Sequence, residues 1–135
     1  MSQIVSRGMR YLRLLPITQR LSRIVLENEP ELRELAQRIN RSAQLQIYDE
    51  FGEFMNIWIG VEDGKPVVKQ GTYPATNTIR MHVDVFLDIL SGKIDFREAV
   101  AHGVVEIQSH DGLPYFYHYV LWSQWFDKLK RLLET

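Results

Sequence analysis

Ser109, His110 and Asp111 are the three residue types of a hydrolytic triad, and they follow one another directly in the chain. A triad needs its members to meet from separate parts of a fold, because adjacent side chains cannot adopt the required hydrogen-bonded line. His110, Asp111 and His118 are also metal-ligand types, but their spacing matches no established metal-binding motif. We therefore expect neither a nucleophile nor a metal centre here, and ordinary surface or capping roles for the histidines.

Other reactive groups are sparse. The chain contains no cysteine, which excludes disulfides, thiol catalysis and cysteine-ligated metals. It has no Gly-Xaa-Ser-Xaa-Gly turn and no phosphate-binding glycine loop. The acidic pairs Asp49-Glu50 and Glu62-Asp63 fall in expected turns, where solvation explains them. These observations predict a protein that is not an enzyme and that uses no cofactor or metal.

Five arginines and no acidic residue occupy the first 26 positions. A basic amphipathic segment of this kind can rest on an anionic bilayer. The simpler alternative is that these arginines form the solvated face of helices packed on a sheet. Nucleic-acid binding is not expected, because the net charge is -1 and aromatic residues do not alternate with the basic ones. The membrane-contact hypothesis concerns Arg7, Arg10, Arg13, Arg20 and Arg23.

Residues 78–92 predict a strand followed directly by a short helix. Ile79 and Met81 alternate with polar residues, as a half-buried strand requires. Asp84 is expected to cap the helix, because its carboxylate can accept from the first amides and meets the positive end of the dipole. Gly92 supplies the left-handed residue that ends this helix.

A second short helix and another strand follow at once. Asp95 and Glu98 form a capping-box pattern at the start of that helix. Gly103 ends it, and the apolar residues of 104–109 begin the next strand.

The order of these features resembles the core of the sterol carrier protein-2 (sterol-binding) domain family. That core reads as a strand, an acidic residue before a short helix, Ser/Thr-Gly-Lys, a second short helix ending in glycine, and a strand. This chain matches it with Asp84, Ser91-Gly92-Lys93 and Gly103. It departs from many relatives at Ser109-His110-Asp111, where they carry a glycine-containing strand end. The resemblance implies a stand-alone, prokaryotic-type member that binds apolar ligands.

The first 42 residues predict helices. One helix is expected before Pro16, a second over 17–26, and a third from Pro30 to about Asn40.

From Ala43 the pattern alternates instead, which predicts strands at 43–47, 54–61 and 66–70. In the second of these, Phe54 and Trp58 are expected on the face opposite the aliphatic residues. Asp63-Gly64 marks a tight hairpin.

The expected fold is therefore α+β, with about five strands in a mostly antiparallel sheet, and the resemblance implies that helices cover one face of this sheet. A chain of 135 residues suits one domain with a helical N-terminal extension at 1–42, and the resemblance implies a lipid-binding core at 43–135. No apolar run approaches a membrane span or a secretory signal, so a cytoplasmic protein is expected.

The last predicted helix, from about Pro114 to Leu133, is aromatic nearly all the way round its first half. Such a helix lies in the core, covers an apolar cavity or forms a subunit interface. Relatives in the family use the C-terminal segment to close a lipid tunnel, which favours the cavity. The predicted lining residues are Trp58, Phe86, Ile89, Leu90, Phe116, Tyr119, Val120 and Trp122.

The resemblance implies non-catalytic carriage of a lipid-like molecule in an apolar tunnel between sheet and helices. The ligand class spans fatty acids, acyl-CoA, phospholipids, sterols and isoprenoid quinones. The alternative is an interaction or dimerisation module that serves an enzyme of lipid metabolism, with a homodimer formed through the aromatic helix.

Overall fold

The computed structural model describes residues 3–27, 30, 34, 41–110, 122–128, 130 and 131. Eight elements have defined bounds: α1 (Gln3–Glu27), β1 (Ala43–Asp49), β2 (Gly52–Glu62), β3 (Lys65–Gln70), β4 (Asn77–His82), α3 (Val83–Leu90), α4 (Phe96–Ala101) and β5 (Val105–Ser109). Residues 122–128 are also helical. The helix expected over 30–40 lies outside the described residues except for Pro30 and Glu34, which are both helical.

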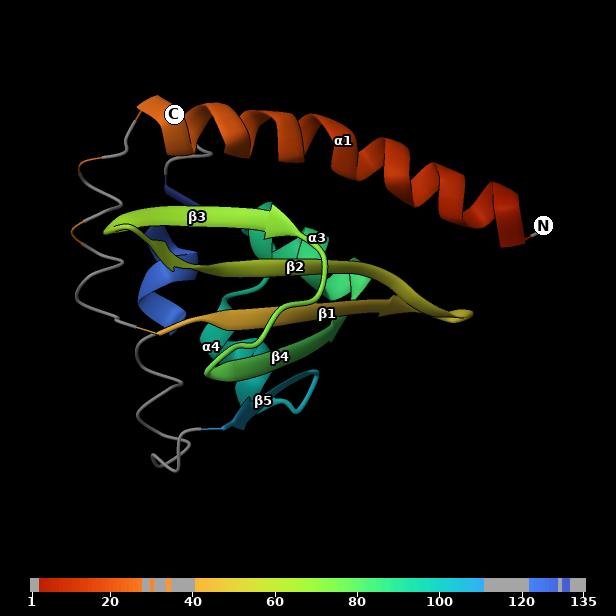
Figure 1. Ribbon diagram of the computed structural model, residues 1–135. Helices are drawn as coiled ribbons and strands as arrows, with labels where there is room; N and C mark the ends of the chain where they lie inside the picture. Colours follow the sequence, from red (N-terminus) through yellow and green to blue (C-terminus); the bar gives the residue numbers. More distant parts are fainter. Residues whose placement is uncertain are drawn as a thin grey trace.

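The five strands form one sheet in the order β3-β2-β1-β4-β5 (Figure 1). β1–β2, β2–β3 and β4–β5 are antiparallel pairs, whereas β1 and β4 run parallel. The parallel pair arises because the chain leaves the β2–β3 hairpin, crosses to the other side of β1 and enters β4. The carboxyl ends of β1 and β4 consequently lie side by side at the same end of the sheet.

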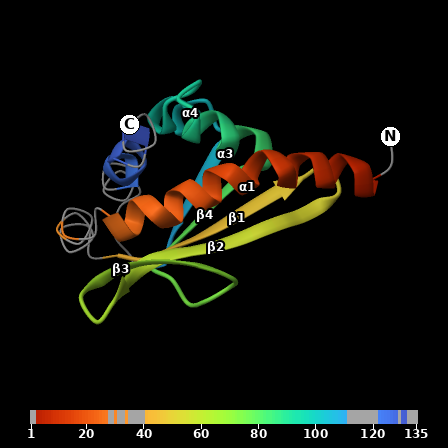
Figure 2. The same cartoon turned by 90° about the horizontal axis from the view of Figure 1, so that it is seen from above.

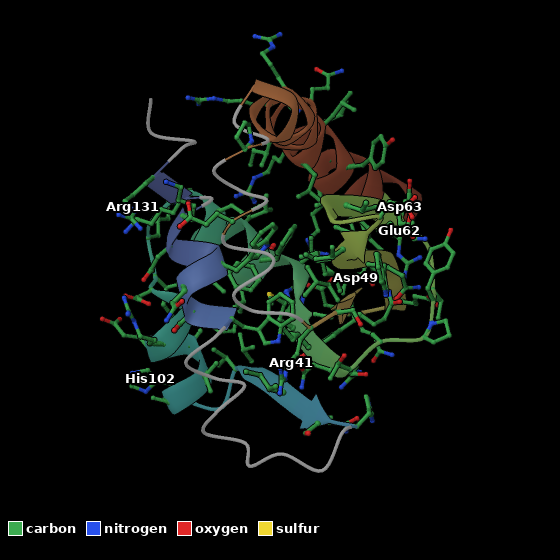
Figure 3. All side chains as sticks on the ribbon, turned by 60° about the vertical axis from the view of Figure 1, so that its left-hand side comes forward. Arg41, Asp49, Glu62, Asp63, His102 and Arg131 are labelled. Atoms are coloured by element: carbon green, nitrogen blue, oxygen red, sulfur yellow. The ribbon has the colours of Figure 1, made fainter. Side chains whose placement is uncertain are left out.

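All described helices lie on one side of the sheet, as expected for this α+β class. α1, α3 and α4 share that side, together with the helix at 122–128 (Figure 2). Figure 3 shows His102 and Arg131 extending from the outer side of this helix layer. The predicted fold class is confirmed.

The alternating pattern places the core between the sheet and the helices. Leu45, Ile47, Ile79 and Met81 are buried on the helix-facing side, as predicted. Phe54 is an exception, because it packs against this core instead of the opposite face. The register shifts between Ile47 and Tyr48, and this irregularity in the β1–β2 ladder changes the alternation.

The predicted turns are present. Asp63 and Gly64 have φ values of 53° and 76°, which is the conformation that a tight hairpin between β2 and β3 requires. Gly92 ends α3 with φ 81°. Asp95 caps α4 by accepting from the Arg97 amide at 2.9 Å.

The predicted break at Pro16 is wrong, because α1 is one helix that contains this proline. Proline removes the amide that would bond to the carbonyl of Leu12. Pro16 and Leu12 are both exposed, so water can solvate that carbonyl and continuation of the helix becomes tolerable.

Within the described residues, no helix combines the length and the hydropathy needed to cross a membrane.

Candidate functional site

The helix-facing side of the sheet carries a continuous apolar layer. Phe86, Ile89 and Leu90 lie on α3 at i, i+3 and i+4, and all three are buried against the sheet. α3 begins directly where β4 ends, so the chain folds back over the strand that it has just left. The layer thus contains three of the predicted lining residues.

The helix at 122–128 closes the same layer. Trp122 is buried, and its indole Nε1 donates to Asn77 Oδ1 of β4 at 3.0 Å. Phe126 stacks on Phe96 of α4 with ring centroids 4.4 Å apart. Trp122 therefore joins Phe86, Ile89 and Leu90 in one core cluster.

Trp125 adds an unusual polar group to this layer. Its side chain is buried, and within the described part of the chain its indole Nε1 has no hydrogen-bond acceptor. A buried donor without a partner loses the hydrogen bond that water would have made, at a cost of about 1–3 kcal/mol. Trp125 was absent from the predicted lining set, although its i+3 spacing from Trp122 places it on nearly the same helix face.

Trp58 lies on the opposite face of the sheet, away from the four predicted lining residues of the apolar layer, Phe86, Ile89, Leu90 and Trp122. Its indole Nε1 donates to the Pro74 carbonyl at 3.0 Å, and its ring meets Tyr73 edge-on. The ammonium of Lys69 lies 4.7 Å from the Trp58 centroid and 4.0 Å from the Tyr73 centroid. Phe116, Tyr119 and Val120 fall outside the described residues.

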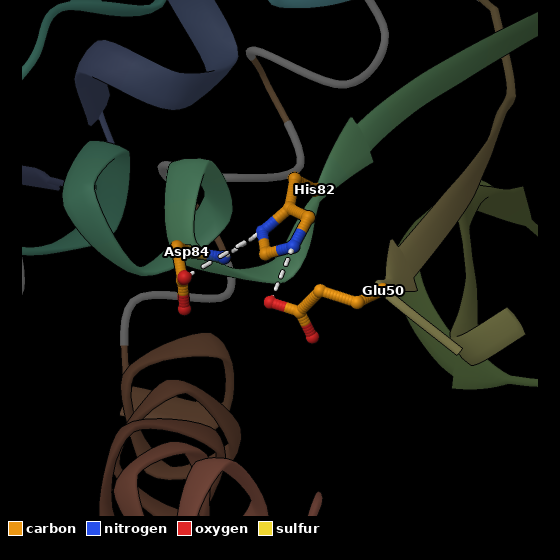
Figure 4. A group of neighbouring side chains, drawn as sticks. All are labelled: Glu50, His82 and Asp84. Carbon is orange, nitrogen blue, oxygen red and sulfur yellow. Dashed lines mark hydrogen bonds and ion pairs between the residues drawn. The ribbon is translucent and has the colours of Figure 1, made fainter. Parts of the chain in front are cut away.

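A charged cluster stands at the edge where β1 and β4 end. Arg10 of α1 donates to both carboxylate oxygens of Glu50 at 2.5 Å, and to both oxygens of Asp84 at 3.3 Å. His82 lies between the two acids, with Nε2 3.5 Å from Glu50 and Nδ1 3.7 Å from Asp84 (Figure 4). The cluster thus ties α1 to both strand ends.

The predicted capping role of Asp84 is wrong. His82 caps α3 instead, because its Nδ1 accepts from the Asp84 amide at 3.0 Å. The Asp84 carboxylate turns toward Arg10 of α1. The sequence around Asp84 resembles a cap because both residues lie at the strand–helix junction.

The ligand atoms of Glu50, His82 and Asp84 lie within 4.8 Å of one another, which is close enough to consider a metal ion. However, the Arg10 guanidinium already occupies both carboxylates, and His82 Nδ1 accepts the capping bond. A bound cation would have to displace that guanidinium. These side chains therefore fit a set of ion pairs that holds α1 to the strand ends better than they fit a metal centre.

The same contacts set the ionisation of the cluster. The hydrogen bond from Arg10 holds the pKa of Glu50 at about 2, below its ordinary value. The hydrogen bond to Glu50 raises the pKa of Arg10 in return, with a further contribution from Asp84. Both groups therefore stay charged over the whole physiological range.

A second ion pair lies beside this cluster. Arg7 Nε and Nη2 donate to the carboxylate oxygens of Asp49 at 2.8 and 2.9 Å. The Asp49 side chain is fully buried, and it also accepts from the Phe51 amide at 2.8 Å. Burial is the largest influence and would raise the Asp49 pKa, but the bonds from Arg7 and Phe51 together lower it below the ordinary value. Asp49 is thus a buried carboxylate whose ionised form is stabilised by Arg7 and by the Phe51 amide.

The five arginines of the membrane-contact hypothesis consequently separate into two groups. Arg7 and Arg10 are engaged in the ion pairs that hold α1, whereas Arg13, Arg20 and Arg23 are exposed.

No protein-family model matches the chain, and no curated protein matches it in sequence. Solved structures match it in fold. The sterol carrier protein domain 2 of Helicoverpa armigera aligns with a TM-score of 0.63 and 15% identity, over 88% of this chain and 89% of its own. Sterol carrier protein 2 from Yarrowia lipolytica aligns with a TM-score of 0.56 and 11% identity, over 76% of each chain. A ubiquinone synthesis protein, UbiJ-SCP2, aligns with a TM-score of 0.51 and 12% identity, over 74% of this chain and 81% of its own. The chain therefore has the fold of sterol carrier protein-2 domains, as its sequence features predict.

Proposed function

We propose that this protein binds and carries a lipid-like hydrophobic ligand between its sheet and its helices, without catalysing a reaction on it. The ligand class spans fatty acids, acyl-CoA, phospholipids, sterols and isoprenoid quinones. The observation that carries the proposal is the aromatic and aliphatic layer formed by α3, the helix at 122–128 and the sheet, in a fold shared with sterol carrier proteins. Apolar walls with few polar groups are sufficient for such a site.

The energetics of this binding mode are favourable. Burying about 300 Å² of a fatty chain releases about 7 kcal/mol before the entropic cost of association. No charge needs to be desolvated, because the described residues of the core cluster are hydrophobic. A ligand of this kind would therefore be held by its hydrocarbon part.

Trp125 supports a more specific version of the proposal. Its buried Nε1 donor can bind a carbonyl, carboxylate or ester oxygen on a ligand that otherwise contacts only hydrocarbon. This donor favours an oxygen-bearing lipid over a pure hydrocarbon. We expect Trp125→Phe, which keeps the aromatic ring, to weaken binding of a fatty acid more than binding of the matching alkane.

The alternative is an interaction or dimerisation module without a carrier role. Exposed apolar side chains on α1 favour it, since they offer a contact surface. In that case the apolar layer is simply a packed core that takes up no ligand.

The first test is mass spectrometry of the purified protein under native conditions, followed by organic extraction of co-purifying lipids. A stoichiometric lipid or quinone is the expected result, and it identifies the ligand class directly. A ligand-free mass, with no uptake of added fatty acid, acyl-CoA or sterol, would refute carriage and leave the interaction module.

Tryptophan fluorescence locates the ligand. The chain has three tryptophans, of which Trp122 and Trp125 lie in the apolar layer and Trp58 on the other face of the sheet. We expect added fatty acid to change the emission of Trp58→Phe as it changes that of the unaltered chain. If the emission change on adding fatty acid is lost in Trp58→Phe, the ligand binds on the face of the sheet that carries Trp58, and the proposed site is refuted.

A further inference from the structure

A group of aromatic side chains surrounds a cation on the face of the sheet opposite the described helices. Trp58 and Lys69 pair directly across the β2–β3 ladder, and Tyr73 comes from the loop after β3, which lies on this face (Figure 2). The Lys69 ammonium lies 4.7 Å from the Trp58 ring centroid and 4.0 Å from the Tyr73 ring centroid. It also lies 2.5 Å from a carboxylate oxygen of Glu62. We call Trp58, Tyr73 and Glu62 the cage.

The Trp58 wall of the cage is held by contacts that do not involve Lys69. Its ring passes directly over Gly60, where an added Cβ would lie 2.3 Å from a ring carbon. Glycine at this position therefore lets the indole lie against the sheet. The indole Nε1 donates to the Pro74 carbonyl at 3.0 Å, which fixes the orientation of the ring.

The Tyr73 wall is held independently of Lys69 as well. Gln44 of β1 is buried, and its Oε1 accepts from the Tyr73 amide at 2.9 Å. Its Nε2 donates to the Gly71 carbonyl, also at 2.9 Å. These two bonds attach the loop to the sheet directly before and at Tyr73. Both walls should therefore keep their positions when the Lys69 side chain moves away, as a preorganised binding site requires.

Lys69 is an occupant of the cage that a better-suited cation can displace. It lies on the edge strand β3, and the side chains of Lys69 and Glu62 are 32% and 48% exposed. An ion pair this exposed changes an equilibrium by about fivefold or less. A primary ammonium is strongly hydrated and loses part of that hydration between two rings. A quaternary ammonium has no N–H groups to leave unsatisfied, and aromatic cages bind such cations well.

We propose that the cage binds a trimethylammonium group of the choline class, and that Lys69 closes this site from within until the ligand displaces it. The rings of Trp58 and Tyr73 contact the N-methyl groups, and Glu62 neutralises the positive charge. The Lys69 side chain turns outward to water. Free choline and the choline headgroup of a phospholipid offer the same cation. The site goes beyond lipid carriage, because the cage and the apolar layer lie on opposite faces of the sheet.

The test is a titration of the full-length protein with choline chloride, followed by the indole N–H signal of Trp58 in proton–nitrogen correlation spectra. Trp58→Phe identifies this signal among those of the three tryptophans. The control ligands are sodium chloride at equal concentration and the uncharged alcohol in which carbon replaces the choline nitrogen. We expect choline to shift the signal saturably and both controls to leave it unchanged, because neither of them carries a methylated cation.

Substitutions separate the roles of the occupant and the walls. Lys69→Thr removes the internal competitor, so the open fraction of sites rises and choline should bind about fivefold more tightly. Adding Tyr73→Leu to Lys69→Thr removes one aromatic wall and should weaken binding about three- to fivefold. Lys93→Thr is the matched control, because it makes the same change of charge at an exposed lysine outside the sheet. It should bind choline within about twofold of the unaltered chain.

Glycerophosphocholine distinguishes the two sources of the cation. Binding as tight as that of choline supports a phospholipid headgroup as ligand, and binding at least about tenfold weaker supports the free cation.

Three results would overturn the proposal. These are absence of a saturable shift in Lys69→Thr, an equal shift with the uncharged alcohol, and an equal gain of affinity in Lys93→Thr. Lys69→Gln repeats the first measurement with a side chain of similar length, in case Lys69→Thr alters the circular dichroism. Fatty-acid uptake should be unchanged in Lys69→Thr, so failure of the cation site and failure of lipid carriage remain separate outcomes.

Discussion

Replacing Arg7 with methionine should destabilise the protein strongly, although Arg7 lies near the surface. The substitution keeps most of the aliphatic stem and removes the guanidinium. It leaves the Asp49 carboxylate with a side-chain exposure of 0% and without the cation that neutralises it. The Phe51 amide is then the remaining donor that the structure provides to this carboxylate.

The magnitude follows from the burial of the two partners. Breaking a buried ion pair on one side costs about 3–5 kcal/mol, because an uncompensated charge stays inside. Arg7 is 31% exposed, so water reaches part of the site and reduces the penalty. We expect a loss of about 2–4 kcal/mol at pH 7, which corresponds to about 1–2 M in urea midpoint for an ordinary m-value.

The assay is urea unfolding at pH 7 and at lower pH. Because folding lowers the Asp49 pKa in the unaltered protein, the stabilisation by the pair is complete above the unfolded value of 3.8 and is lost as pH falls through the folded pKa. In Arg7→Met only the Phe51 amide still opposes the effect of burial, so Asp49 takes up a proton more readily. The stability difference between the two proteins should therefore shrink as the solution is acidified.

Two further variants decide the interpretation. Arg13→Met changes an exposed arginine of the same helix, and it should stay within about 0.5 kcal/mol of the unaltered protein. Adding Asp49→Asn to Arg7→Met should recover part of the loss, because the buried charge is then removed. If Arg7→Met behaves like Arg13→Met at pH 7, or if its deficit grows on acidification, the assignment of Asp49 as a buried, paired carboxylate is refuted.

Two other substitutions and one titration test separate parts of the structure. Gly60→Ala should displace the Trp58 ring, since an added Cβ would lie 2.3 Å from a ring carbon, and tryptophan emission should shift while the far-ultraviolet circular dichroism stays unchanged. Trp122→Phe should cost about 1–3 kcal/mol in urea unfolding because it leaves the buried Asn77 Oδ1 without its indole donor. The Glu50 carboxyl should titrate with a pKa of about 2 in a carboxyl-detected NMR experiment, and removal of the guanidinium that binds it should raise that pKa toward the ordinary value.

The elements of residues 43–110 were predictable because local signals and core patterning agree there. Asp63-Gly64 fixes the β2–β3 hairpin, and the alternation of Ile79 and Met81 fixes which face of β4 is buried. The prediction for Phe54 was wrong because the register shift near Ile47 breaks the alternation of faces along β2. The alternating sequence pattern does not indicate such an irregularity.

The charged cluster was beyond sequence reasoning for a topological reason. Glu50, His82 and Asp84 meet because β1 and β4 pair in parallel, and that pairing joins strands separated by a whole hairpin. Local patterns around His82 and Asp84 indicate a strand–helix junction and nothing about β1. The capping prediction for Asp84 failed for the same reason, since its actual partner, Arg10, lies 74 residues away.

α1 shows most clearly what a helical pattern leaves undetermined. Periodicity identifies which residues share a face, but it does not say which face is turned inward, and hydrophobicity normally supplies that answer. In α1 the carboxylates at the strand ends determine which face is turned inward, because the buried Asp49 needs a cation. Arg7 and Arg10 lie one turn apart on the helix face that reaches these carboxylates. Once those two arginines face inward, helix geometry forces Met9 and Leu12 outward. The exposed apolar stripe is therefore a direct consequence of the buried ion pair. A variant that removes the demand for a cation, such as Asp49→Asn, should loosen the inward orientation of Arg7, and amide hydrogen exchange along α1 should become faster.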